Sequence, residues 1–245
     1  MIDSEYNLTL VAVSYVISVF GSYTALNLAI RIPSANTGAS LFGWLTMAAI
    51  AIGGGAIWSM HFIGMLAFET NIPVSYDATL TVLSMVLAIF VCGIGLFVVG
   101  RGTSSALKLL AGGVITGLGV AGMHYTGMAA MEMPATISYD TTLFAASIGI
   151  AIVAAIAALW LAFNLRGNLQ RFGSAFVMGV AVCGMHYTGM AAMKMEPTGA
   201  RMFVSNTDNY LLSVYIFLAA GVVLAIMLVT SILLSPKSNE LVFGE

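Results

Sequence analysis

The sequence predicts an all-α membrane protein with seven transmembrane helices, arranged as three parallel two-helix repeats followed by a seventh helix. Three observations support this prediction: an apolar composition, seven long apolar segments and a histidine motif that recurs three times. Of the 245 residues, 60% are hydrophobic and only 7% are charged. Because a soluble domain usually carries about 25% charged residues, the composition indicates a chain that lies in lipid.

Each of the seven apolar segments is long enough to cross the hydrocarbon core, which takes roughly 20 helical residues. The segments are too long for barrel strands, and backbone groups in lipid must bond internally, so we expect helices. The first segment lacks the basic lead-in and cleavage site of a signal peptide, so we expect it to remain as a span. The expected spans are residues 8–30, 41–67, 80–99, 107–129, 143–165, 172–192 and 210–234.

The positions of lysine and arginine predict which helix ends face the cytoplasm. If the amino terminus lies outside, six basic residues fall on the inner side and two on the outer side, as the positive-inside rule requires. The inner residues are Arg31, Arg101, Lys108, Arg166, Arg171 and Lys237, and the outer ones are Lys194 and Arg201. We therefore expect an outer amino terminus and a cytoplasmic carboxyl terminus in a bacterial cytoplasmic membrane.

A two-helix unit occurs three times in the predicted membrane domain, which covers residues 1–235 and is followed by a short tail at 236–245. The copies span about 8–77, 80–140 and 143–208, and the last helix spans 210–234. Because each unit contains two spans, its copies point the same way and can surround a pseudo-threefold axis. A proline follows each motif histidine by 10 to 12 residues, and we expect it to end the helix.

The repeated motif reads Met-His-aromatic-x-Gly-Met and contains all three histidines of the chain. Its copies begin at Met60, Met123 and Met185 and place the histidines at His61, His124 and His186. Ionisable side chains are costly at membrane depth and usually serve a function there. Since the copies fall near the predicted outer ends of the second, fourth and sixth helices, we expect them to form one shared site.

The residue types in the motif predict a soft metal site. Thioethers select Cu(I), whereas imidazole suits copper, iron, nickel and zinc, so we favour Cu(I) with zinc as the alternative. Residues four and seven apart share a helix face, so Met131 and Met193 are expected to extend the stripes that begin at His124 and His186. The predicted ligands are His61, His124, His186, Met60, Met65, Met123, Met128, Met185 and Met190.

Three further side chains near the motifs are candidates for additional ligands or for groups that support ligands. Cys183 lies three residues before His186, although we favour core packing for it because the other copies have no counterpart. Tyr125 and Tyr187 are explained equally well as anchors at the membrane interface. We interpret the motif glycines as close-packing positions; they are Gly64, Gly127 and Gly189.

The motifs resemble the MHYT integral membrane sensor domain of bacteria, named after the Met-His-Tyr-Thr found at residues 123–126 and 185–188. The resemblance covers nearly the whole chain. The copy at residues 60–63 departs from it, because Phe62 and Ile63 replace the tyrosine and threonine. The resemblance implies a sensor that detects oxygen, carbon monoxide or nitric oxide through bound copper. It also implies cytoplasmic signalling domains, commonly ones that make or degrade cyclic di-GMP, as output partners.

Other functions compete with a sensor on the sequence alone. A three-histidine zinc site with a bound water is a hydrolytic arrangement, but the predicted helix interiors hold no carboxylates. Copper transport or storage would suit the methionines, yet all motifs gather at one face. Haem would leave one histidine unexplained, and the predicted seventh helix has no lysine for a retinal Schiff base. No basic run indicates nucleic acid, and no feature predicts an oligomeric state.

Overall fold

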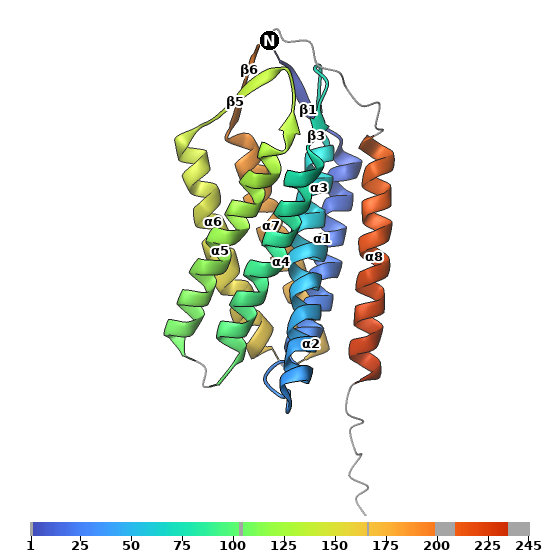
Figure 1. Ribbon diagram of the computed structural model, residues 1–245, viewed down its shortest axis with the longest axis vertical. Helices are drawn as coiled ribbons and strands as arrows, with labels where there is room; N and C mark the ends of the chain where they lie inside the picture. Colours follow the sequence, from blue (N-terminus) through green and yellow to red (C-terminus); the bar gives the residue numbers. More distant parts are fainter. Residues whose placement is uncertain (1, 103–104, 166, 199–208, 235–245) are drawn as a thin grey trace, which may run out of the picture.

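Seven helices of the computed structural model are long and apolar enough to cross a membrane (Figure 1). They begin and end within four residues of the predicted spans, which confirms the prediction of a multi-pass helical membrane protein. The structure describes residues 2–102, 105–165, 167–198 and 209–234. The predicted tail at 236–245 and the end of the third predicted repeat, residues 199–208, lie outside these ranges.

One of the seven spans is built from three consecutive helical parts, and each of the others is a single α-helix. The second span consists of α2 (Gly38–Ala49), the π-helix η1 (Ile50–Trp58) and α3 (Ser59–Leu66), joined without a break. The remaining helices are α1 (Leu8–Ala29), α4 (Ala78–Gly100), α5 (Ala106–Ala129), α6 (Thr141–Asn164), α7 (Asn168–Ala191) and α8 (Asn209–Leu233). The sequence did not predict a π-helix, which widens the backbone turn just before His61.

Helices α1, α4 and α6 start in the same way, with an Asx residue as the N-cap. The side chains of Asn7, Asp77 and Asp140 accept hydrogen bonds from backbone N–H groups of the first turn, at 2.7 to 3.3 Å. The backbone N–H of each cap residue donates to the residue that follows the neighbouring motif helix. These acceptors are the carbonyls of Ala67, Ala130 and Ala192. Each cap therefore fixes one helix start beside one helix end.

Six short strands, which an all-α prediction did not include, cover the helix ends that carry the motifs (Figure 1). They form three antiparallel pairs, β1 with β2, β3 with β4 and β5 with β6. The strands are β1 (Ser4–Tyr6), β2 (Phe68–Thr70), β3 (Ser75–Tyr76), β4 (Met131–Glu132), β5 (Ala135–Tyr139) and β6 (Met193–Pro197). We call this layer the strand cap. Each pair joins the chain entering one helix to the chain leaving another, so three long-range strand pairs cover the site.

The strand cap corrects two expectations from the sequence. The motif helices end at Leu66, Ala129 and Ala191, five residues after their histidines, so the prolines do not end them. Pro73, Pro134 and Pro197 instead lie in the cap, where a missing N–H is tolerated at strand edges and turns. The predicted helical stripe is also wrong in its last position, because Met131 and Met193 lie on strands β4 and β6.

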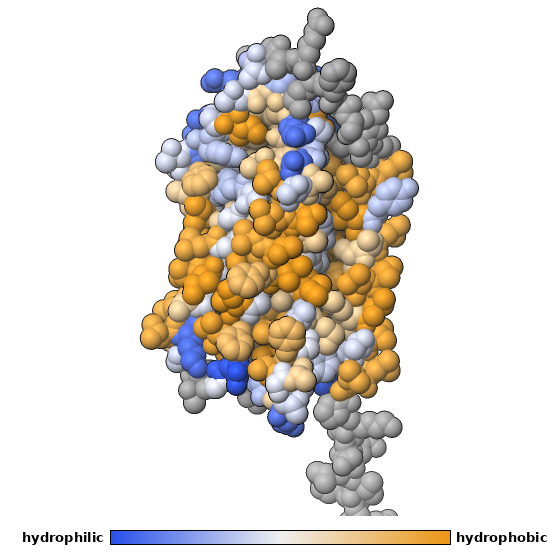
Figure 2. Space-filling model, viewed as in Figure 1, coloured by the Kyte–Doolittle hydropathy of each residue, from blue (hydrophilic) through white to orange (hydrophobic). Residues whose placement is uncertain are grey.

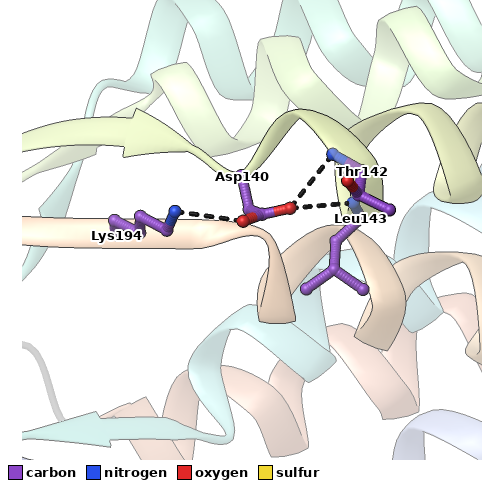
Figure 3. A network of polar contacts seen from close by, with 4 residues as sticks. All are labelled: Asp140, Thr142, Leu143 and Lys194. Carbon is purple, nitrogen blue, oxygen red and sulfur yellow. Dashed lines mark hydrogen bonds and ion pairs between the residues drawn. The ribbon is translucent and has the colours of Figure 1, made fainter.

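The surface separates into an apolar middle and polar ends, as expected for a protein in a bilayer (Figure 2). Side chains such as Phe90, Val153 and Val180 are more than half exposed in mid-helix. At the strand cap, Lys194 of β6 pairs with Asp140 at 3.0 Å and so joins β6 to the start of α6 (Figure 3). The Lys194 ammonium holds the pKa of the Asp140 carboxyl below its ordinary value. Both groups are partly exposed, so this pair contributes little to stability.

Candidate metal centre

The three histidines, 62 and 63 residues apart in sequence, meet in the interior of the bundle. The Nδ1 atom of His61 lies 3.0 Å from Nδ1 of His186 and 3.1 Å from Nδ1 of His124. The three rings are at most 1% exposed, and their centroids lie 4.8 to 5.3 Å apart. Among the described His, Cys, Asp and Glu residues, these three form a group whose ligand atoms lie within 4.8 Å of one another.

This spacing fits a small metal ion. Ligand nitrogens about 3.3 Å apart surround an ion tetrahedrally when the metal–nitrogen bonds are 2.0–2.1 Å long. The two Nδ1 distances from His61 are within a few tenths of an ångström of that value. Hydrogen bonding alone accounts less well for the cluster, because Nδ1 of His61 has either one proton or one lone pair and lies near two partners. A metal at the Nδ1 atoms would use all three lone pairs at once, and the buried Nε2 atoms, which have no hydrogen-bond partner, would carry the ring protons.

Each histidine ring is held against a glycine of a different motif. A Cβ atom added to Gly127 would lie 2.2 Å from Nε2 of His61, too close for any side chain. The same contact joins Gly189 to His124 at 2.2 Å and Gly64 to His186 at 2.5 Å. The contacts run in one direction around the axis, so the three motifs enclose one another's imidazoles. The close packing expected of these glycines is therefore packing against the histidines themselves.

Comparison with known proteins identifies the motif. Three consecutive matches to the MHYT family, described as "Bacterial signalling protein N terminal repeat", cover residues 54–112, 117–175 and 179–238. The chain belongs to the MHYT family. Each match begins within a motif span; the first two run into the next motif helix, and the third continues through α8. No solved structure matches the chain.

Several MHYT relatives are signalling proteins of bacteria. The chain is 44% identical over 95% of its length to the bifunctional diguanylate cyclase/cyclic di-GMP phosphodiesterase MucR of Pseudomonas aeruginosa. It is 36% identical over 80% of its length to the cyclic di-GMP phosphodiesterase NbdA of the same species, and 35% identical over 83% to the signaling protein YkoW of Bacillus subtilis. The chain spans 35%, 26% and 26% of these relatives, so the alignment covers a minor part of each.

The MHYT tyrosines connect the site to the surrounding helices. Tyr125 contacts the ring of His124 at 4.8 Å between centroids, and its hydroxyl lies 2.7 Å from Oγ of Ser147 on α6. Tyr187 likewise contacts His186 at 4.7 Å and reaches Oγ of Ser14 on α1 at 3.2 Å. Because each serine donates its own proton to a backbone carbonyl, the tyrosine is the donor in both pairs.

The first motif compensates for its missing tyrosine through a different residue. Phe62 has no hydroxyl, but it stacks on Trp58 at 5.4 Å, and the Trp58 Nε1–H donates to Oγ of Ser84 on α4 at 3.1 Å. Ser84 occupies the same place relative to its helix cap as Ser147 and Ser14 do, and all three are buried. Each motif helix is thus bonded to the first helix of the next unit. Sequence analysis missed these serines, although their spacing of seven residues from Asx caps repeats three times.

The motif threonines have a local role instead of a place at the histidines. Thr126 donates to the carbonyl of Gly122 and Thr188 to that of Gly184, both at 2.7 Å and four residues back in the same helix. A hydroxyl satisfied within its own helix can be replaced by an apolar group with little effect. This bonding explains why Ile63 is compatible with the first motif.

The methionines divide into two layers on either side of the histidines. Met65, Met128 and Met190 pack together with Met131, Met133 and Phe68 beneath the strand cap, and Met193 contacts this cluster. The methionines that precede the histidines are buried in the interior of the helix bundle. Met123 and Met185 share one apolar cluster, and Met60 belongs to another. Cys183 lies outside the histidine group and packs against apolar residues. Tyr6 of the cap packs against this cluster, and burial raises its pKa to about 12, so its hydroxyl is neutral at physiological pH.

Proposed function

We propose that this domain is a sensor that holds copper at His61, His124 and His186, with methionines of the motifs as further ligands, and detects a diatomic gas. The convergence of three buried imidazoles carries the proposal. Bound copper would supply a coordination position for oxygen, carbon monoxide or nitric oxide. The sulfur-rich layer of Met65, Met128 and Met190 favours Cu(I) over harder ions.

We further propose that the strand cap lies at the periplasmic face of the cytoplasmic membrane and that the signal leaves at the opposite end. The basic side chains of Arg31, Arg101, Lys108 and Arg171 belong to the uncapped end, in agreement with the positive-inside rule. A displaced imidazole would move its ring contacts and the serine bonds to the next helix, so the three units would respond together. The names of MucR and NbdA suggest enzymes of cyclic di-GMP turnover as the output.

A zinc hydrolase is less well supported by the site. The acidic residues near the site, Glu69, Glu132 and Glu196, lie exposed on strands of the cap and do not join the histidine group. A hydrolase of this kind needs a carboxylate or another base within hydrogen-bond reach of the bound water.

Metal analysis of protein purified without a metal-binding tag tests the proposal. We expect stoichiometric copper in the wild type and its loss in His124→Ala. Met128→Leu should retain copper but bind Cu(I) more weakly than wild type, whereas Met47→Leu, in α2 and outside the motifs, should bind it normally. Loss of a direct ligand should exceed the roughly 10- to 100-fold weakening that outer-shell changes typically cause.

The outcome also separates sensing from the other functions. A carbon monoxide stretching band from the Cu(I) protein would support a gas-accessible site, and its absence would favour storage or transport. Stoichiometric zinc together with hydrolytic activity would indicate that the protein is an enzyme and not a sensor. Copper that stays bound at wild-type affinity in His124→Ala would exclude the histidine cluster as its site.

A further inference from the structure

An apolar cavity of about 70 Å³ lies between α6 and α7, apart from the histidine cluster. Its walls consist only of alanine, valine, isoleucine, leucine and methionine side chains. Most of the α6 wall is alanine: Ala151, Ala154, Ala155, Ala157 and Ala158. An apolar cavity of this kind offers water no hydrogen bonds, whereas it can hold a small nonpolar molecule.

The residues at the inner end of the cavity lie close to the histidines in sequence. Ile57, Val120 and Val182 line it, and each stands four residues, about one helical turn, before a motif histidine. Met185, the residue preceding His186, also lines it. Each of the three motif spans thus lines the cavity with a residue one helical turn before its histidine. The cavity therefore ends beneath the histidine cluster, on the side away from the strand cap.

The outer end of the cavity reaches the surface that faces lipid. Val177 is 62% exposed, and Ala157 is also exposed, and both lie in the middle of spanning helices. From this rim the lining passes through half-buried Ala154 and Ala181 to Ala151 and Met185, which are 3% and 2% exposed. A molecule dissolved in the hydrocarbon core can therefore enter from the side, without crossing the cap.

In the preceding helix pair a larger side chain occupies the corresponding place on the first helix. Counted from the helix caps Asp77 and Asp140, Val91 on α4 is the counterpart of Ala154 on α6. A Cβ atom added to Gly119 on α5 would lie 2.4 Å from a methyl group of Val91, so that pair is in close contact. In the α6–α7 pair the counterparts are Ala154 and Ala181, which line the cavity instead.

We propose that this cavity binds a small apolar gas molecule that enters from the bilayer between α6 and α7 and delivers it to the histidine cluster. The delivery step rests on the proposed function, whereas gas binding in the cavity does not require a metal. Oxygen, carbon monoxide and nitric oxide are nonpolar enough to dissolve in lipid. An entrance that faces the hydrocarbon core is therefore open to the phase in which these gases are more concentrated.

Xenon provides a test of the cavity in metal-free protein. We expect saturable shifts in the methyl NMR signals of Met185 and Ala155 under xenon pressure, and their loss in both Ala154→Leu and Ala181→Leu. Val153→Leu is the matched control, because Val153 lies on α6 but is 67% exposed and does not line the cavity. Wild-type protein without saturable shifts, or filled variants that keep them, would overturn the proposal.

Carbon monoxide kinetics on the Cu(I) protein test the delivery step. Ala154→Leu should slow association and dissociation by the same factor, because an obstructed path leaves the affinity unchanged. Equal rates in Ala154→Leu and Val153→Leu would refute delivery through the cavity. If wild-type protein bound no carbon monoxide, the proposed copper function and the delivery step would fail, while the xenon experiment would still decide gas binding in the cavity.

Discussion

At the residue scale, the site depends on three glycines as much as on three histidines. Each glycine stands three residues after a histidine, yet it contacts the histidine of another motif. A methyl group there would overlap the imidazole Nε2 and turn the ring away from the common centre. The glycine thus sets the position of a ligand that it does not itself provide.

Gly127→Ala should therefore lose metal binding while the protein still folds. The new methyl group would lie 2.2 Å from Nε2 of His61, and overpacking of this kind costs about 1–3 kcal/mol. Metal content and thermal unfolding in detergent measure the two effects.

Gly122→Ala is the matched control on the same helix, where the added Cβ would meet only Leu87 at an ordinary 3.8 Å. It should keep the metal, and it should be unchanged or more stable by up to about 1 kcal/mol, since alanine favours the helix. If Gly127→Ala bound metal as well as Gly122→Ala does, the contact with His61 would not control the ligand.

The histidines were predictable because an ionisable residue that recurs in three motif copies of an apolar chain can be recognised from the sequence alone. The direction of the contacts was not predictable, since it depends on which motif faces which around the axis. Trp58 shows the limit most clearly. It supplies the hydrogen bond that Phe62 lacks, from one turn earlier in the helix, and no alignment of the motifs by position would pair the two residues.

At the scale of elements, the π-helix η1 lets the second span approach its neighbours closely. A Cβ atom on Gly53 would lie 2.6 Å from the carbonyl oxygen of Ala88 on α4, and a Cβ atom on Gly21 of α1 would lie 2.5 Å from the backbone nitrogen of Ala56. The Ser59 hydroxyl donates to the carbonyl of Gly54, five residues back, and so supports the wide turn. The π-helix ends at Trp58, three residues before His61, so its register sets the position of the His61 ring.

Gly53→Ala should destabilise the protein, because the obstacle is backbone that cannot rotate away. We expect a loss of about 1–3 kcal/mol from overpacking. Gly43→Ala, in the same span, meets no heavy atom within 4 Å and should be neutral or stabilising by up to about 1 kcal/mol. Thermal unfolding of both variants in one detergent makes the comparison, and equal midpoints would contradict the close approach.

The spans, including the ends of the motif helices, were predictable from hydropathy alone, whereas the strands of the cap were not. Met131 and Met193 continue the helical spacing of the motifs, so the predicted stripe ran past the helix ends at Ala129 and Ala191. The strands form because the cap residues hydrogen-bond across each helix pair, and this long-range pairing leaves no local signal. The prolines were a misleading signal, since they lie in strand β6 and in the connections between cap strands instead of at helix ends.

At the scale of the whole molecule, the spans that precede α8 contact one another in a closed ring, and α8 lies at one side of the bundle (Figure 1). Serine bonds join α5 to α6, α7 to α1 and the second span to α4. Helix α8 contacts the ring at the π-helix, where Leu224 covers Gly55. A change at His61 therefore has a short path through η1 to α8, which runs to the uncapped end of the bundle.

The proposed direction of signalling requires the strand cap to face the periplasm, and single cysteines can test this orientation. In a Cys92→Ala, Cys183→Ala background, Glu132→Cys lies exposed on β4, and Ser105→Cys lies exposed at the uncapped start of α5. A membrane-impermeant maleimide added to intact spheroplasts should label the first variant. It should label the second only after the membrane is opened.

The cysteine-free background controls for non-specific labelling, and Val153→Cys, in the middle of α6, controls for reagent that enters the lipid. Both should stay unlabelled in intact and in opened cells. The reverse pattern, with Ser105→Cys labelled from outside, would place the histidine cluster near the cytoplasm. Gas arriving through the bilayer would still reach the cavity in that orientation, because its rim lies at mid-membrane, but α8 would then lead away from the cytoplasmic enzymes proposed as the output.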